Sequence, residues 1–294
     1  MARLSASEST DASFKDRLFA TVQLALPTRF LSWLMYLITR LEWPWFKNWF
    51  IRVFMRGFNI SLAEAEHPQP EDYASFNAFF TRALKPDARG IAPAPAFLSP
   101  VDGTISQLGS VRDGRIFQAK GHEYSAVELL GGDALTAREF IGGQFATIYL
   151  APYNYHRIHM PVSGRLRHWR YVPGRLFSVN PATARAMPGL FARNERVVAI
   201  FDTDIGPLAM VLVGALFVGS METVWAGQIS PPHKRHSEGG NFITNLPIKL
   251  SRGDEMGRFN MGSTVILLTA PGAVQWDGVA RPGATVRMGQ ALGR

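Results

Sequence analysis

The chain has 294 residues, of which 47% are hydrophobic and 18% are charged. This composition provides for a sizeable buried core and excludes a disordered polyelectrolyte. The absence of cysteine excludes disulfide scaffolds, cysteine nucleophiles and thiolate metal sites. Lysine and arginine number 31 against 23 acidic residues, giving a formal net charge of +8, which favours anionic partners such as lipid headgroups, nucleic acid or an acidic substrate.

Residues 14–60 combine aromatic with basic side chains. Seven basic residues stand against two acidic ones, and four of the seven tryptophans lie here: Trp33, Trp43, Trp45 and Trp49. Pro27 and Pro44 divide the stretch into short helices, and its longest apolar run, residues 30–39, is half of the about 20 residues that a bilayer span needs. Such helices are typical of segments that lie in an anionic headgroup region, although an aromatic face packed on a core gives the same spacing. We therefore expect residues 1–62 to be a polar tail followed by amphipathic, membrane-associating helices.

The remaining residues, 63–294, are predicted to form the main folded domain. Apolar spacing predicts a helix over residues 73–84. From Gly90 onward, short apolar runs alternate with Gly, Pro and Asp turns and predict strands, notably at residues 146–150, 196–201, 208–218 and 264–268. The sequence thus predicts an α+β protein with a β-rich, sandwich- or barrel-like core.

Two segments carry acid–base side chains. Asp102 lies between Pro100 and Gly103, which predicts a turn between strands, where an aspartate most often bonds its own backbone. His156 and His159 are three residues apart in a predicted loop. A histidine pair acts as a catalytic base when a second group holds the ring, or it binds a metal with a third ligand, for which Asp102 is the candidate.

A third segment carries a hydroxyl. Ser263 follows Gly262 at the start of a β-branched run, a pattern that on its own is typical of a tight turn entering a strand. It does not match the G-x-S-x-G hydrolase elbow, because Val265 occupies the last position. Asp102, a histidine and Ser263 nevertheless make a possible Ser-His-Asp set, with no geometry fixed by the sequence.

Several segments together resemble the membrane-associated, pyruvoyl-dependent phosphatidylserine decarboxylases of bacteria. The resemblance runs in order from residue 76 to the C-terminus and includes FNAFFTR (76–82), SPVDG (99–103), YLAPYNYHRIHMP (149–161), LFSVNP (176–181), LFARNERV (190–197), GSMETVWAG (219–227) and EMGRFNMGSTVI (255–266). The family's cleavage motif is often Leu-Gly-Ser-Thr. Here Met261 takes the place of the leucine, a change that keeps volume and apolarity.

The resemblance implies that the chain is a proenzyme that cuts itself between Gly262 and Ser263. The Ser263 hydroxyl attacks the Gly262 carbonyl, and the amide becomes an ester. Elimination releases residues 1–262 as the large chain, and the dehydroalanine that remains hydrolyses to a pyruvoyl group on residues 263–294. By family position His159 is the base for this step and Asp102 orients it.

The resemblance also implies the reaction, the cofactor and the partners. The pyruvoyl group derived from Ser263 forms a Schiff base with phosphatidylserine and serves as an electron sink while CO2 leaves. His156 is the candidate that assists this step and protonates the carbanion, and phosphatidylethanolamine is released. The implied partners are phosphatidylserine, an anionic membrane surface and the two cleavage products themselves, which can dimerise further. Neither a metal nor nucleic acid is implied, and the implied location is peripheral, on the cytoplasmic face of the cell membrane.

Two secondary sites are weaker candidates. The basic run from His233 to His236 can hold the substrate phosphate, but such a run is more often a solvated loop. Phe177 and Ser178 lie in a family-like run and are candidates for lining the acyl entrance, although core packing accounts for them equally well.

Two other functions remain open from the residues. The first is a metal-dependent hydrolase that uses Asp102, His156 and His159. The second is a biotinyl- or lipoyl-like interaction module, because residues 283–293 have the glycine spacing of such domains. That module needs a lysine at a hairpin tip, and the only lysines after Arg196 are Lys234 and Lys249, neither in such a setting.

Overall fold

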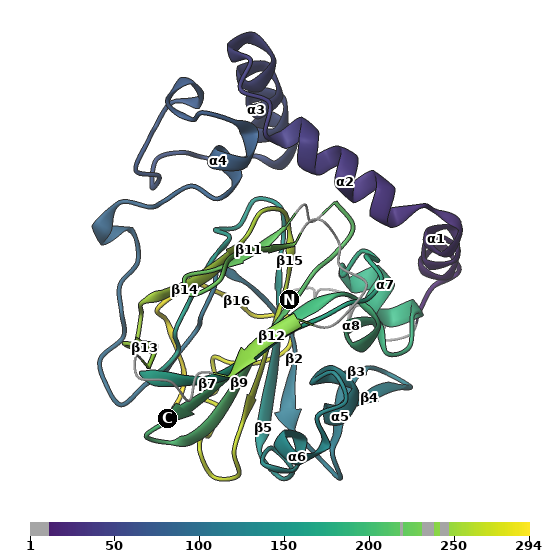
Figure 1. Ribbon diagram of the computed structural model, residues 1–294, viewed down its shortest axis with the longest axis vertical. Helices are drawn as coiled ribbons and strands as arrows, with labels where there is room; N and C mark the ends of the chain where they lie inside the picture. Colours follow the sequence, from purple (N-terminus) through teal and green to yellow (C-terminus); the bar gives the residue numbers. More distant parts are fainter. Residues whose placement is uncertain (1–11, 218–219, 231–237, 242–246) are drawn as a thin grey trace, which may run out of the picture.

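The computed structural model describes residues 12–217, 220–230, 238–241 and 247–294 (Figure 1). Three N-terminal helices, α1 (Phe14–Ala25), α2 (Thr28–Thr39) and α3 (Pro44–Phe58), form an arm along one end of the molecule. The helices begin and end where the sequence dictates. Ser13 caps α1, Pro27 separates α1 from α2, and Pro44 opens α3. The expected division of this stretch by its two prolines is confirmed.

The faces of α1 and α2 are reversed relative to those of an ordinary surface helix. On α1 and α2 the buried side chains are mostly polar: Asp16, Gln23, Thr28, Ser32 and Thr39. The exposed side chains of the three helices are largely apolar, and among them Phe14 is 79% and Trp45 72% exposed. An ordinary surface helix buries its apolar stripe and exposes its polar one.

Hydrogen bonds fix the polar face to the rest of the molecule. The Gln23 amide donates to Thr183 Oγ1 at 3.2 Å and accepts from the backbone N–H of Ser178 at 2.7 Å. Farther along, Arg40 Nη2 donates to Ser220 Oγ at 3.0 Å. Within the described residues no single helix is long and apolar enough to cross a bilayer. Taken together, α1 and α2 have sufficient length and apolarity, but a bend of 83° separates them.

A short helical segment links the arm to the sheets. It contains the 3-10 turns Pro70–Asp72 and Pro86–Ala88 and the helix α4 (Phe76–Phe80). The predicted helix over residues 73–84 is thus reduced to five residues. Ser75 caps its start, and the backbone N–H of Thr81 ends it by bonding Asn77 and Phe79. The buried phenylalanines of α4 pack with Ile51, Phe50 and Phe54 of α3 as a separate small core.

The main body is an antiparallel, nine-stranded sheet. Its strands in spatial order are β12 (Glu238–Asn241), β7 (Gly164–Val172), β8 (Arg196–Thr203), β9 (Gly206–Val213), β15 (Ser263–Thr269), β5 (Gln144–Leu150), β2 (Gly103–Ser110) and β16 (Thr285–Val286), with β13 (Lys249–Leu250) beside β7. The four predicted strands are present as β5, β8, β9 and β15, although β9 ends at Val213 and not at residue 218.

Smaller elements complete the fold. A four-stranded sheet has the order β11 (Gly227–Ser230), β10 (Met221–Thr223), β14 (Glu255–Phe259) and β6 (Arg157–His159). Two-stranded pairs join β1 (Phe97–Leu98) to β17 (Ala291–Gly293) and β3 (Arg115–Ala119) to β4 (His122–Ser125). The remaining helices are α5 (Ala126–Leu129), α6 (Ala134–Arg138), α7 (Pro181–Ala186) and α8 (Leu190–Arg193).

The α+β class is confirmed. The sheets do not close into a barrel within the described part of the chain, so the barrel-like detail of the prediction is not confirmed. All seven residues of β15 are buried, and β5 and β9 pair with it on its two edges. The first residue of β15 is therefore held in one of the most rigid parts of the molecule.

Candidate active site

Ser263 opens β15 opposite Leu150 of β5 and is fully buried. Its hydroxyl oxygen has no hydrogen-bond partner among the described residues. The preceding Gly262 packs closely against its neighbours: a Cβ built on this glycine would be in van der Waals contact with the Leu150 carbonyl oxygen, at 3.5 Å, and with His156 Nε2, at 3.7 Å. The bond between these two residues therefore lies beside an imidazole nitrogen and an unbonded hydroxyl.

His156 is the histidine at this bond. Its Nδ1 lies 2.8 Å from the carbonyl oxygen of Asn154. Because a carbonyl only accepts hydrogen bonds, Nδ1 carries the proton and Nε2 keeps its lone pair. The ring is fully buried against Phe80, with ring centroids 4.1 Å apart, and Nε2 has no partner among the described residues. Burial, with Arg82 nearby, lowers the pKa of His156 to about 3, so the ring is neutral at physiological pH.

His159 is at the end of β6 and is held on both ring nitrogens. Its Nδ1 donates to the carbonyl oxygen of Gly253 at 2.8 Å, and its Nε2 lies 3.1 Å from the Tyr155 hydroxyl. With Nδ1 protonated, Nε2 accepts the Tyr155 proton. Burial lowers the pKa of His159 as well.

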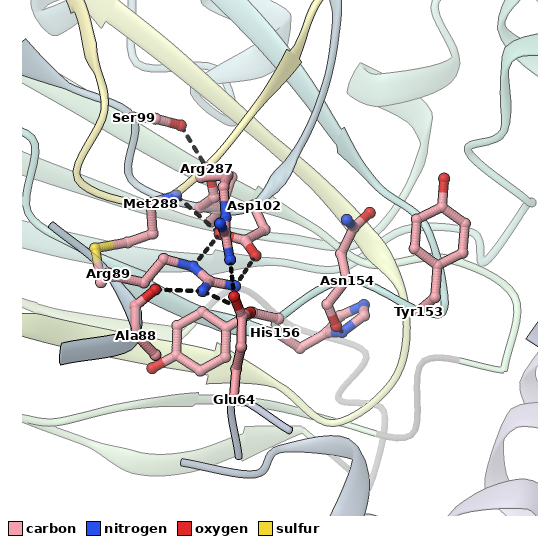
Figure 2. Close-up of polar contacts among 12 residues, drawn as sticks. Glu64, Ala88, Arg89, Ser99, Asp102, Tyr153, Asn154, His156, Arg287 and Met288 are labelled. Atoms are coloured by element: carbon pink, nitrogen blue, oxygen red, sulfur yellow. Dashed lines mark hydrogen bonds and ion pairs between the residues drawn. The ribbon is translucent and has the colours of Figure 1, made fainter. Parts of the chain in front are cut away.

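Asp102 lies in the connection between β1 and β2, as the turn prediction requires, but it is buried and does not project from an exposed turn. Its carboxylate accepts from Arg89 Nε at 3.0 Å and from the backbone N–H of Met288 at 2.8 Å, and it forms an ion pair with Arg89 Nη2. Figure 2 shows these contacts, which continue from Arg89 to Glu64. Within the described residues no hydrogen bond joins Asp102 to His156 or His159.

The structure thus brings Gly262, Ser263 and His156 together, while His159 and Asp102 are each bonded elsewhere. Asp102 still acts on His159 electrostatically, raising its pKa slightly against the larger effect of burial.

Sequence reasoning missed four residues around this site: Arg82, Arg89, Asn154 and Tyr155. Arg82 closes the FNAFFTR run, and Asn154 and Tyr155 directly precede His156, so the motifs contained a signal for these three. Arg89 lies in an unremarkable connection, and nothing in the sequence marked its contact with Asp102.

Two cavities flank the segment at residues 152–155. An apolar cavity of about 330 Å³ is lined by Gly262 and Leu150 on one side and by aromatic residues of the arm and α4 on the other: Phe50, Phe54, Phe58 and Phe80. Of the two candidates for the acyl entrance, Ser178 lines this cavity, whereas Phe177 belongs to the main hydrophobic core. A polar cavity of about 290 Å³ is lined by Tyr153, Asn154, Tyr155, Asp102 and three arginines, Arg82, Arg89 and Arg287.

Two other candidates gain no support. The basic run His233–His236 lies outside the described residues. Among the described residues no three histidine, aspartate or glutamate side chains converge in a way that could hold a metal ion, so the geometry does not favour the metal-dependent hydrolase.

Comparison with known proteins shows which family the chain resembles over most of its length. Residues 76–294 match the family model described as phosphatidylserine decarboxylase, and residues 18–59 match a second model described as PSD. The chain is 56% identical over 281 residues to the phosphatidylserine decarboxylase proenzyme of Nitrosococcus oceani, covering 95% of this chain and 92% of the relative. It is similar to proteins of the same name from Stutzerimonas stutzeri, at 54% identity, and Bordetella pertussis, at 53%, with 95% of both chains covered in each case.

Proposed function

Because this chain belongs to the phosphatidylserine decarboxylase family, it is a pyruvoyl-dependent carboxy-lyase that converts phosphatidylserine to phosphatidylethanolamine, and we propose which residues carry out its maturation and its reaction. One observation carries the assignment of the site. His156 Nε2 lies beside Gly262, the next residue is the buried Ser263, and neither this nitrogen nor the Ser263 hydroxyl has a hydrogen-bond partner among the described residues.

Ser263 is the proposed precursor of the cofactor, and the bond between Gly262 and Ser263 is the proposed cleavage site. The residues fit a group formed there, because no described residue hydrogen-bonds the hydroxyl and holds it away from the Gly262 carbonyl, and its burial excludes bulk water. When present, the pyruvoyl carbonyl supplies an electron sink for the carbon that loses CO2. Cleavage at this bond makes residues 1–262 and 263–294 the two chains of the mature enzyme.

His156 is the proposed proton carrier of decarboxylation. Its neutral ring presents the Nε2 lone pair beside Gly262. The substrate arrives as an ammonium ion and must lose a proton before its nitrogen can attack a carbonyl. His156 Nε2 accepts that proton, and the same atom returns one to the α-carbon after CO2 has left. The bond from Nδ1 to Asn154 keeps the ring in this orientation throughout.

His159 is the proposed base of self-cleavage, oriented by Asp102, as the resemblance implies. Its neutral state, maintained by burial, suits a base. In the structure described here its Nε2 accepts from Tyr155, and Asp102 is bonded to Arg89. Cleavage therefore requires the Nε2 of His159 to exchange the Tyr155 hydroxyl for that of Ser263.

The proposed domain division assigns residues 1–62 to membrane association and residues 63–294 to catalysis. The reversed faces of α1 and α2 support it, since their polar sides are occupied by hydrogen bonds to the catalytic body and their apolar sides face outward. Exposed basic residues with no acidic partner among the described residues lie beside the apolar side chains of the arm: Lys15, Arg17, Arg29 and Arg56. Each adds about 1 kcal/mol of attraction to an anionic surface.

The apolar cavity connects this membrane-facing arm to the site. It is bounded by Phe50, Phe54 and Phe58 of the arm and by Gly262, so a lipid whose acyl chains remain at the arm can extend its headgroup to residue 263. We therefore propose a peripheral enzyme of the cell membrane, on the cytoplasmic face. The absence of cysteine fits that reducing compartment.

The proposal is tested by the intact mass of the purified protein. We expect two polypeptides that correspond to residues 1–262 and 263–294, the smaller one carrying a pyruvoyl group and converting phosphatidylserine. Ser263→Ala should give a single uncut chain without activity, because it removes the attacking oxygen. Thr264→Ala, a matched loss of the neighbouring buried hydroxyl, should still be cut. A wild-type chain that remains whole yet decarboxylates phosphatidylserine would refute the assignment of Ser263.

A further inference from the structure

Arg82 is a buried cation without a counterion. Its side chain is 7% exposed, and it donates one hydrogen bond, from Nη2 to the Tyr153 carbonyl oxygen, at the long distance of 3.4 Å. Its guanidinium carbon lies 5.4 Å from the centre of the Phe79 ring. Among the described residues no carboxylate lies within ion-pair distance of it. Since a buried charge without a partner is costly, this arrangement indicates that an anion is missing.

The other cations of the same cavity do have partners. Arg89 is bonded to both Asp102 and Glu64, and Arg287 forms an ion pair with Glu64. Three arginines and two carboxylates therefore line the polar cavity, and the positive charge that remains is that of Arg82. The Asp102 carboxylate acts on Arg82 at longer range, but its oxygens are already engaged by Arg89 and by the backbone of Met288.

The nitrogens of Arg82 are available to a ligand. A guanidinium has five N–H donors in a planar fork that matches two oxygens of one anion. Toward the described residues Arg82 uses one of these donors, in the long bond to Tyr153. Each Arg82 nitrogen that makes no hydrogen bond retains some solvent exposure. The unused donors therefore reach the cavity that Arg82 lines.

Arg82 also lies close to the reacting centre. It is two residues from Phe80, whose ring packs on His156, and its charge contributes to the low pKa of His156. Pro152 lines the apolar cavity, whereas its neighbours Tyr153, Asn154 and Tyr155 line the polar one. The two cavities thus lie on either side of one short segment that ends at His156.

We propose that Arg82 binds an oxyanion of the substrate headgroup and so sets the position of phosphatidylserine relative to residue 263. This inference rests on the proposed function. The acyl chains remain at the arm beside the apolar cavity, the amine reaches residue 263, and a negatively charged group enters the polar cavity and binds the free face of the guanidinium. The headgroup offers two such anions, the phosphodiester and the serine carboxylate, which share this chemistry.

The experiment compares wild-type enzyme, Arg82→Gln and Arg82→Lys in mixed micelles of defined phosphatidylserine content. We expect Arg82→Gln to be cut normally by mass, with a KM for phosphatidylserine raised at least tenfold. Arg82→Lys should lie between the two, because an ammonium keeps the charge but loses the fork. Arg165→Gln, which removes an exposed arginine paired with Asp202, is the matched control and should keep the wild-type KM.

Inhibition by phosphatidylethanolamine identifies the anion, because the product keeps the phosphodiester and has lost the carboxylate. If Arg82 binds the phosphodiester, Arg82→Gln weakens inhibition by the product as much as it raises KM. If Arg82 binds the carboxylate, KM rises while product inhibition is unchanged. A KM and an inhibition constant that both equal those of wild type overturn the proposal, as does a loss confined to kcat.

Maturation and binding are separated by the same measurements. If Arg82→Gln remains uncut, the KM of Arg82→Lys decides: an increase supports the proposal and a wild-type value overturns it. A wild-type protein that is cut but does not decarboxylate phosphatidylserine contradicts the proposed function itself, before any variant is compared.

Discussion

At the scale of single residues, the two histidines differ in what their ring nitrogens are free to do. His156 has one nitrogen fixed by Asn154 and the other open beside Gly262. His159 has both nitrogens occupied, by Gly253 and Tyr155. Although they are three residues apart in sequence, the two histidines are therefore not interchangeable. We expect removal of one to affect self-cleavage and removal of the other to affect decarboxylation.

We predict that His159→Ala remains uncut, because its base is missing, and that His156→Asn is cut but decarboxylates at least 100-fold more slowly, the usual scale for losing a general acid–base group. The asparagine amide keeps a donor for the Asn154 carbonyl, so the site retains its shape. Electrophoresis reports cleavage and CO2 release reports turnover. The opposite pattern, an uncut His156→Asn and a cut His159→Ala, would transfer the role of self-cleaving base to His156.

The sequence singled out both histidines, Asp102 and Ser263 as candidates by residue type, turn signals and resemblance, but it did not predict their contacts. The bond between Arg89 and Asp102 joins residues 13 positions apart, and the contact of Asp102 with Met288 spans 186 positions. Such pairs depend on how strands from distant parts of the chain meet, and hydrophobic periodicity holds no information about that. The burial of Asp102 was missed for the same reason.

At the scale of elements, the helices of the arm were predictable because proline and capping act locally. Pro27 and Pro44 mark the starts of α2 and α3 wherever tertiary contacts place these helices. The α4 segment was overpredicted for the converse reason: residues 73–84 have helical spacing, but Ser75 and Thr81 close the helix after five residues. Which face of each helix would be buried was not predictable from spacing alone, since an aromatic stripe suits a core as well as a membrane.

The outward aromatic face of the arm makes a prediction about membrane binding. Leu18, Trp33 and Trp49 are each at least 44% exposed, one on each helix. Replacing all three by glutamine should remove about 1 kcal/mol of apolar burial per residue in the membrane interface and weaken binding to phosphatidylglycerol vesicles roughly 100-fold. The thermal midpoint should change little, because these side chains are exposed. Sedimentation with the vesicles measures the effect.

The control removes exposed apolar residues elsewhere. Phe117, Leu135 and Val279 are 40%, 77% and 55% exposed and lie outside the arm. Their replacement by glutamine should leave vesicle binding as it is in wild type. Equal losses for the two triple variants would show that general surface hydrophobicity, and not the arm, binds the membrane.

At the scale of the whole molecule, cleavage at Gly262 would turn one folded chain into two without removing any element from the sheet. Residues 263–294 contribute β15 to the middle of the main sheet, β16 to its edge and β17 to the pair with β1. β15 pairs over its whole length with β5 and over six residues with β9, and Asp102 holds the backbone of Met288. The small chain is thus bound by the same contacts that fold the uncut protein.

We predict that the two chains co-elute in gel filtration under native conditions and separate only in denaturant. Because unfolding of the cut protein releases two molecules from one, its urea midpoint should rise with protein concentration, as mass action requires. Ser263→Ala has the same sheet on a continuous chain, so its midpoint should show a weaker dependence or none. Gel filtration and urea titrations at concentrations 100-fold apart provide the measurement. Elution of the small chain on its own, or equal concentration dependence in the two proteins, would mean that the strands from β15 to β17 are not what holds the mature enzyme together.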